Sequence, residues 1–273
     1  LGAEGLSLTS ILIVNSLGKT SDSPEKLARL ERYIAELNTG YGNGANKAGL
    51  VIENGEVAEH GEEVDGYGEF RYDWTASLGW LALRSRLLDG SKIKAGDSVV
   101  ALQEKGFRCN GFSLALNVVE QAFGHEWHLQ PFSDETTWGD ELLRPSQIYA
   151  GIITRLTGGY RPDINPLADI HGVAHITGGG IPEKLGRKLK GLGLGAQLDS
   201  LFEPSPAMLE IQRRAKIDDE EMLNVFNGGQ GMLVITPEPE KVIEEAGVAG
   251  VCGAIAGAIT NSTDIEVLSQ GLD

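Results

Sequence analysis

The sequence predicts a mixed α/β fold in two domains, which we place at residues 1–88 and 97–273. Apolar runs short enough for buried strands alternate along the chain with segments of helical periodicity. Turn-forming residues at 89–97 (DGSKIKAGD) separate the two parts. A chain of 273 residues has room for two ordinary domains, and a hydrophobic share of 41% is enough for a sizeable core.

The first domain is expected to contain three strands and one helix. The strands are predicted at residues 7–14, 47–52 and 72–83, and the helix at residues 24–37. Ser23 suits the N-cap of this helix, and Pro24 suits its first turn. A glycine- and asparagine-rich loop is expected at residues 38–46. An acidic loop is expected at residues 53–69, either as a solvated surface or as part of a metal site.

The second domain is predicted to contain six helices, two strands and one inserted loop. The helices are expected at residues 112–123, 145–156, 182–190, 206–215, 218–226 and 238–246, and the strands at 173–176 and 232–235. Residues 112–123 are apolar around most of the helix, which predicts a buried position. Residues 124–141, rich in His, Trp and turn formers, are expected to form the loop.

The charge of the chain limits the classes of partner. Lys and Arg number 23 against 39 Asp and Glu, a net charge of -16, which argues against nucleic acid or an anionic membrane as partner. The longest apolar run, residues 248–259, is far shorter than the ~20 residues of a membrane span. Two cysteines far apart in sequence suggest neither a disulfide framework nor a zinc site, so the expected location is the cytoplasm.

The most informative segment is residues 175–180 (HITGGG), followed by a proline at 182. An apolar strand, three glycines and a helix start would expose backbone N–H groups at the positive end of a helix dipole. Such an arrangement suits a phosphate group. The same glycines also suit a tight turn that only reverses the chain.

Five ordered motifs resemble those of aminoimidazole ribonucleotide synthetase, the ATP-dependent cyclo-ligase of purine synthesis. They are residues 97–102 (DSVVAL), 106–114 (GFRCNGFSL), 144–149 (RPSQIY), 170–180 (IHGVAHITGGG) and 220–232 (EEMLNVFNGGQGM). Residues 1–4, 49–59, 71–76 and 88–97 resemble the family more faintly. The resemblance therefore extends over almost the whole chain.

Two motifs of the family do not occur in this sequence. They are a glycine-rich D-G-V-G-T-K segment and an N-D pair, which in the family bind nucleotide and metal. Because the first residue is Leu rather than Met, we expect the sequence to be a fragment that holds only part of the nucleotide site.

The resemblance implies an ATP-dependent ring closure of formylglycinamidine ribonucleotide to aminoimidazole ribonucleotide. ATP would phosphorylate the amide oxygen, an internal amidine nitrogen would attack the activated carbon, and phosphate would leave. The implied cofactors are ATP and Mg²⁺, and the implied ligands are the ribonucleotide substrate and ATP. The implied fold has two α/β domains, the first incomplete here, that pair through N-terminal strands into a homodimer.

The resemblance also indicates which residues form the site. The expected catalytic residues are His175, Asn110 and Asn227. The expected phosphate- or substrate-binding residues are Thr177, Gly178, Gly179, Gly180, Gly111 and Gly229, and the expected Mg²⁺ ligands are Glu56 and Asp73.

Each of these assignments has a structural alternative. His175 could be a core histidine, Asn110 a helix-entry turn, and the turn after Asn227 a helix C-cap. Arg108 and Cys109 stand where the family usually has His-Ser. Arg108 could therefore serve as a cation that pairs with phosphate.

Two other functions remain open. Related ATP-using enzymes of the same fold include small-molecule kinases and a hydrogenase-maturation dehydratase. A non-catalytic binding or assembly subunit is a further alternative, which the retained glycine loops disfavour.

Overall fold

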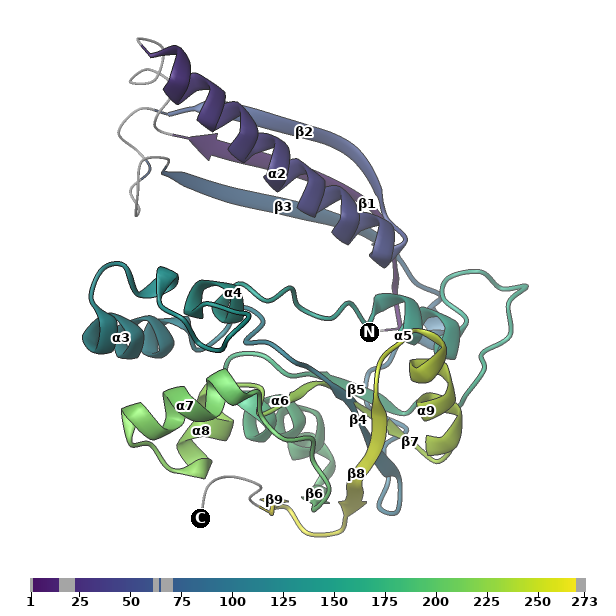
Figure 1. The fold of residues 1–273 in the computed structure, drawn as a ribbon. Helices are drawn as coiled ribbons and strands as arrows, with labels where there is room; N and C mark the ends of the chain where they lie inside the picture. Colours follow the sequence, from purple (N-terminus) through teal and green to yellow (C-terminus); the bar gives the residue numbers. More distant parts are fainter. Residues whose placement is uncertain (1, 15–22, 61–63, 65–70, 269–273) are drawn as a thin grey trace. The chain divides into compact units, whose positions relative to one another are not determined.

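The computed structural model describes residues 2–14, 23–60, 64 and 71–268. The chain divides into two compact units, one formed by Ala3–Arg84 and the other by Leu1–Gly2 with Ser85–Asp273. Both units combine a sheet with helices, as Figure 1 shows, so the predicted α/β class is confirmed.

The first unit is a three-stranded sheet with one long helix along it (Figure 1). The strands β1 (Glu4–Val14), β2 (Val51–Glu59) and β3 (Tyr72–Leu81) lie in the order β2-β1-β3, with β1 parallel to β2 and antiparallel to β3. The helix α2 (Pro24–Ala48) packs aromatic rings on the sheet, since Tyr41 contacts Trp74 at a centroid distance of 5.0 Å.

The beginning of α2 was predicted correctly and its end was not. Ser23 is the N-cap, and its hydroxyl accepts a hydrogen bond from the Lys26 N–H at 3.5 Å. The helix continues through residues 38–46, the predicted loop, to a left-handed Gly49. The predicted strand at 47–52 therefore begins only at Val51, and residues 53–59 of the predicted acidic loop are strand β2. The rest of that loop, apart from residues 60 and 64, lies outside the described residues.

The second unit is built on a six-stranded sheet in the order β5-β7-β4-β8-β6-β9. Its strands are β4 (Ser98–Gln103), β5 (Gly172–His175), β6 (Gly195–Leu198), β7 (Gln230–Thr236), β8 (Gly253–Thr260) and β9 (Ile265–Val267). All neighbours pair antiparallel except β6 and β9. Strands β4, β6, β8 and β9 were not predicted.

Helices cover both faces of this sheet. They are α3 (Phe112–Phe123), α4 (Trp138–Leu142), α5 (Ala150–Thr157), α6 (Gly180–Leu189), α7 (Pro206–Ala215), α8 (Asp219–Val225) and α9 (Pro239–Val248). Val99 of β4 belongs to the apolar core with α3, α6 and α7, whereas Val100 belongs to the core with α5 and α9. Neighbouring strand residues thus point into two separate cores.

Three helix predictions need correction. Helix α5 begins at Ala150 rather than at 145, and residues 144–149 form a segment without regular secondary structure. The predicted loop at 124–141 contains a 3-10 turn at Trp127–Leu129 and most of α4, whose Trp138 is buried. Helix α3 buries one face only, since Ala115 and Val119 are buried while Ser113 is exposed.

A buried histidine fixes the start of β5, the strand that leads into the candidate site. The Nδ1 atom of His171 lies 2.7 Å from Asp97 Oδ2, and its Nε2 atom lies 3.1 Å from Asp169 Oδ2. His171 and Asp97 are both buried, so water cannot replace the hydrogen bond between them. The imidazole therefore joins the segments before β4 and β5.

We expect His171→Gln to lower the free energy of unfolding by about 1–3 kcal/mol, because it leaves a buried carboxylate short of a donor. Urea unfolding measures this loss, and His128→Gln, which changes an exposed histidine, is the control. Equal unfolding free energies for the two variants would contradict the role of His171.

None of the helices within the described ranges is both long enough and apolar enough to cross a membrane.

Candidate functional site

Three loops meet at one edge of the six-stranded sheet. Strands β4 and β5 end at this edge and β7 begins there, since Gln103 pairs with Gln230 and His175 with Met232. The loops at residues 104–111, 176–180 and 226–230 therefore lie side by side. The motifs that the sequence separates by more than 100 residues form one surface.

Asn227 fastens two of these loops together. Its side chain is fully buried, donates to the Gly106 carbonyl at 2.8 Å and accepts from the Gly229 N–H at 2.8 Å. These bonds position the adjoining glycine loop. Asn227 stays a predicted site residue, and its observed contacts are with the backbone.

The side-chain oxygen of Asn110 has no hydrogen-bond partner within the described ranges. Its Nδ2 donates to the Val225 carbonyl at 2.8 Å, while its Oδ1 is buried and has no hydrogen-bond partner. A buried acceptor without a donor is costly, and such groups are rare in folded proteins. A ligand donor at this atom would remove the cost, which makes Asn110 the stronger of the two asparagine candidates.

Three of the predicted glycines are required by close packing. A Cβ atom at Gly111 would overlap the Phe226 ring, and one at Gly229 would overlap the Glu203 carbonyl. A Cβ atom at Gly180 would overlap the carbonyl oxygen of Leu223 on α8. All three also have positive φ, between 58° and 91°. Close packing and positive φ therefore explain why these positions are glycine, and no ligand is needed for that explanation.

The remaining residues of the turn, Thr177 to Gly179, directly precede the first residue of α6. The turn is closed by a hydrogen bond from the Gly180 N–H to the Thr177 carbonyl at 2.8 Å. Gly178 is exposed, and a Cβ atom built on it would meet nothing within 4 Å. The helix dipole and Lys184, 20% exposed on α6, make this end of the helix positive.

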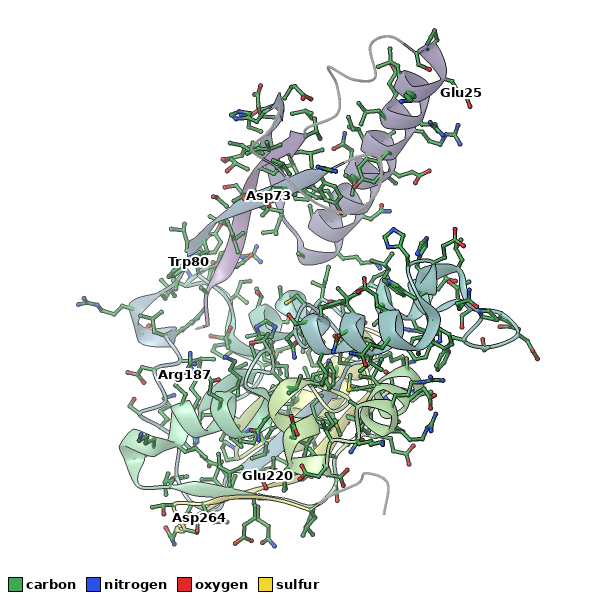
Figure 2. The ribbon with its side chains drawn as sticks, turned by 90° about the vertical axis from the view of Figure 1, so that its left-hand side faces the viewer. Glu25, Asp73, Trp80, Arg187, Glu220 and Asp264 are labelled. Atoms are coloured by element: carbon green, nitrogen blue, oxygen red, sulfur yellow. The ribbon has the colours of Figure 1, made fainter. Side chains whose placement is uncertain are left out.

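A carboxylate already lies at this helix end. The Glu183 side chain lies over Gly179 and pairs with Lys184 at 3.3 Å and with Arg187, which Figure 2 labels on α6. Hydrogen bonding and charge from Lys184, then from Arg187, hold the pKa of Glu183 below its usual value. An anion bound at Gly179 must displace this half-exposed carboxylate.

A buried carboxylate, Glu104, lies beneath the three loops and was not predicted. It is 3% exposed and accepts from the backbone N–H groups of Lys105, Gly106 and Gln147 at 3.0–3.2 Å. It also accepts from Arg108 Nη1 at 2.9 Å and from the Tyr149 hydroxyl at 3.3 Å. Five donors to one carboxylate fix its position.

Tyr149 and Arg108 extend this network. The Tyr149 hydroxyl also donates to the Gln103 carbonyl at 2.7 Å. Burial and the neighbouring Glu104 raise the pKa of Tyr149, so its hydroxyl stays protonated and serves as a donor. The Arg108 guanidinium turns inward to Glu104 and contacts His175 Nε2. Its two terminal nitrogens are thus engaged within the protein, whereas its buried Nε has no hydrogen-bond partner among the described residues.

His175 is exposed at the end of β5. Partial desolvation, then the positive charges of Arg108 and Lys184, hold the pKa of His175 below its usual value. Its imidazole is therefore neutral at neutral pH. His175, Thr177 and Lys184 lie together at the same helix end, so the site combines a neutral imidazole, a hydroxyl and a cation.

The two predicted Mg²⁺ ligands lie in the first unit. Glu56 on β2 pairs with Ile11, and Asp73 on β3 (Figure 2) pairs with Ile13. They lie on the two outer strands of the three-stranded sheet, with β1 between them. In the described part of the chain, no group of three or more His, Cys, Asp or Glu residues could hold a metal.

Comparisons with known proteins point to one family. The family described as "AIR synthase related protein, C-terminal domain" matches residues 94–269. Phosphoribosylformylglycinamidine cyclo-ligase from Methanococcoides burtonii is 31% identical over 98% of this chain. The enzymes of the same name from Sorangium cellulosum and Pseudothermotoga lettingae are 34% and 36% identical over 83% and 80% of this chain. The chain spans 72%, 63% and 58% of their respective lengths.

Solved structures share the fold at lower identity. The HypE–HypF complex matches with a TM-score of 0.58 and 21% identity over 100% of this chain and 78% of that chain. Thiamine-monophosphate kinase from Stenotrophomonas maltophilia matches with a TM-score of 0.60 and 15% identity, over 98% and 73% of the two chains. HypE in complex with ATP matches with a TM-score of 0.57 and 17% identity, over 95% and 66%.

Proposed function

We propose that this chain, which belongs to the family of AIR synthase related proteins, takes part in the ATP-dependent closure of formylglycinamidine ribonucleotide to aminoimidazole ribonucleotide. The observation that carries the proposal is the meeting of His175, Thr177 and Asn110 at one sheet edge, beside the positive end of α6. The names of its relatives, at 31–36% identity, agree with this reaction.

The residues of the site suit the transfer of a phosphoryl group followed by ring closure. Lys184 and the N-terminus of α6 would stabilise negative charge on phosphate oxygens, and the Thr177 hydroxyl and the Gly178 N–H would orient them. Asn110 Oδ1 would accept a hydrogen bond from the ribonucleotide. The protein thus contributes positioning and charge stabilisation, and the reaction requires no covalent nucleophile.

ATP and Mg²⁺ are proposed as cofactors of the complete site. Mg²⁺ bound to ATP would neutralise phosphate charge. Glu56 and Asp73 are the residues of this chain proposed to hold the ion. No step assigned to residues of this chain depends on either carboxylate.

We also propose a homodimer that uses the first unit. Side chains alternate along β1, so Leu12 and Val14 are buried while Ile11 is 49% exposed. A second copy of the sheet could cover this exposed side. Cytoplasmic location remains part of the proposal, and the two cysteines, Cys109 and Cys252, are free and exposed.

We expect the protein, made from its natural gene and supplied with Mg²⁺, to form ADP from ATP only when formylglycinamidine ribonucleotide is present. A coupled ADP assay measures this dependence. His175→Gln should lower turnover while the thermal unfolding midpoint stays nearly unchanged, since the side chain is exposed. Gln121→Ala, an exposed change on α3, is the control.

The other outcomes identify the alternatives. ADP formation driven by thiamine monophosphate, or by another small molecule in place of the ribonucleotide, would indicate a kinase or dehydratase of the same fold. A folded protein without ATP turnover under any of these conditions would indicate a non-catalytic subunit.

A further inference from the structure

Arg108 is a buried cation in an unfavourable backbone conformation. Its φ of 61° is left-handed, a conformation that non-glycine residues rarely adopt, and its side chain is only 9% exposed. Its guanidinium donates to Glu104 at 2.9 Å and to the Gln147 carbonyl at 3.4 Å. Its Cζ atom lies 5.5 Å from the centre of the Tyr149 ring. These contacts hold the guanidinium in place against the backbone strain.

The other side of the same guanidinium contacts His175. Arg108 Nη2 lies within hydrogen-bond distance of His175 Nε2. A guanidinium has five N–H donors and no acceptor, so Nε2 must be the acceptor and must carry no proton. A neutral imidazole has one ring proton, which must then be on Nδ1.

We propose that Arg108, anchored by Glu104, is a positioning residue that holds His175 neutral with its proton on Nδ1. His175 then presents an N–H donor rather than a base. In the described part of the chain, Nδ1 has no protein hydrogen-bond partner, and the side chain is exposed. The group it suits is an anionic or carbonyl oxygen of a ligand.

The charged groups around His175 support this assignment. Arg108 and Glu104 come from the loop after β4, and Lys184 comes from α6. Desolvation of the imidazole is the main cause that lowers the pKa of His175; the charges of Arg108 and Lys184 lower it further, and Glu104 opposes them more weakly. Lys184 acts through charge alone, whereas Arg108 also acts through its hydrogen bond.

Nuclear magnetic resonance of the histidine nitrogens tests the proposal on the full chain without any ligand. Long-range proton–nitrogen spectra of ¹⁵N-labelled protein distinguish the two neutral tautomers, and His175→Gln assigns the signal among the five histidines. We expect the Nδ1–H tautomer in the unmodified protein. Arg108→Met should shift the tautomer towards Nε2–H and move the titration to higher pH.

Lys184→Met is the matched control, because it removes a neighbouring charge but no hydrogen bond to His175. It should move the titration to higher pH and leave the Nδ1–H tautomer in place. An Nε2–H tautomer in the unmodified protein would overturn the proposal, even if Arg108→Met did not fold. An unchanged tautomer in a folded Arg108→Met protein would also overturn it.

The effect of the His175 N–H donor on turnover rests on the proposed function. The assignment of the His175 tautomer does not. If the protein lacks ribonucleotide-dependent ATP turnover, the spectra still decide whether Arg108 sets the tautomer. If it has that turnover, Arg108→Met should lower kcat more than it changes KM, since the donor is aimed at the reacting group.

Discussion

Replacing Glu104 with Ala should lower the free energy of unfolding of the second unit by about 3–5 kcal/mol, because it leaves the buried Arg108 without its counter-ion. The Glu104 side chain is 2% exposed and that of Arg108 is 9% exposed, so water cannot take over the lost interaction. The same change removes the acceptor for the Gln147 N–H and for one hydrogen bond of Tyr149. Urea unfolding followed by circular dichroism measures the loss.

Glu210→Ala is the matched control for this prediction. Glu210 also pairs with arginines, Arg213 and Arg214, but these are 60% and 32% exposed. Exposed pairs contribute only about 0–1 kcal/mol, so this variant should unfold almost as the parent does. A loss for Glu104→Ala as small as that for Glu210→Ala would show that Glu104 does not anchor the network.

The hydrogen-bond network around Glu104 is a part of the site that could not be predicted from the sequence. Its position directly after the apolar run of β4 is a visible signal, since a charged residue at a strand end is well placed for function. Its partners Gln147 and Tyr149 follow 43 and 45 residues later, and no local pattern connects them. The buried network was therefore missed, although the motifs that contribute its members were found.

The capping signal at Ser23 predicted the start of α2, but no local signal predicted its end. The Ser23 hydroxyl accepts a hydrogen bond from the first turn of the helix, as the sequence indicates. The end of α2 was missed because Gly40, Gly42 and Gly44 suggested a loop. Each such glycine costs about 1 kcal/mol in a helix, and packing on the sheet through Tyr33 and Tyr41 opposes that cost.

Strand β8 was not predicted because its sequence is determined by packing against neighbouring strands. Its sequence, GAIAGAIT, alternates small and apolar residues without a clear period of two. The small residues are needed because β8 lies between β4 and β6, and a Cβ atom at Gly257 would overlap the Gln197 carbonyl. A requirement set by a neighbouring strand cannot be read from the segment itself.

The largest remaining effect is expected at the glycine turn, where Gly180→Ala should lower the free energy of unfolding by about 2–5 kcal/mol. A φ of +58° costs Ala roughly 1–2 kcal/mol. The overlap of its Cβ with the Leu223 carbonyl would push α8 away from α6, and such overpacking costs typically about 1–3 kcal/mol. Thermal or urea unfolding measures the sum.

Gly178→Ala, two residues earlier in the same turn, separates packing from ligand binding. Its Cβ would meet nothing within 4 Å, and its φ is not in the left-handed region, so stability should change by less than about 1 kcal/mol. The new methyl group would nevertheless stand where an anion approaches the backbone, so affinity for the ribonucleotide should fall. A stable Gly178→Ala protein with unchanged ribonucleotide affinity would contradict the phosphate site. The glycines of the turn would then serve only the packing of α6 on α8.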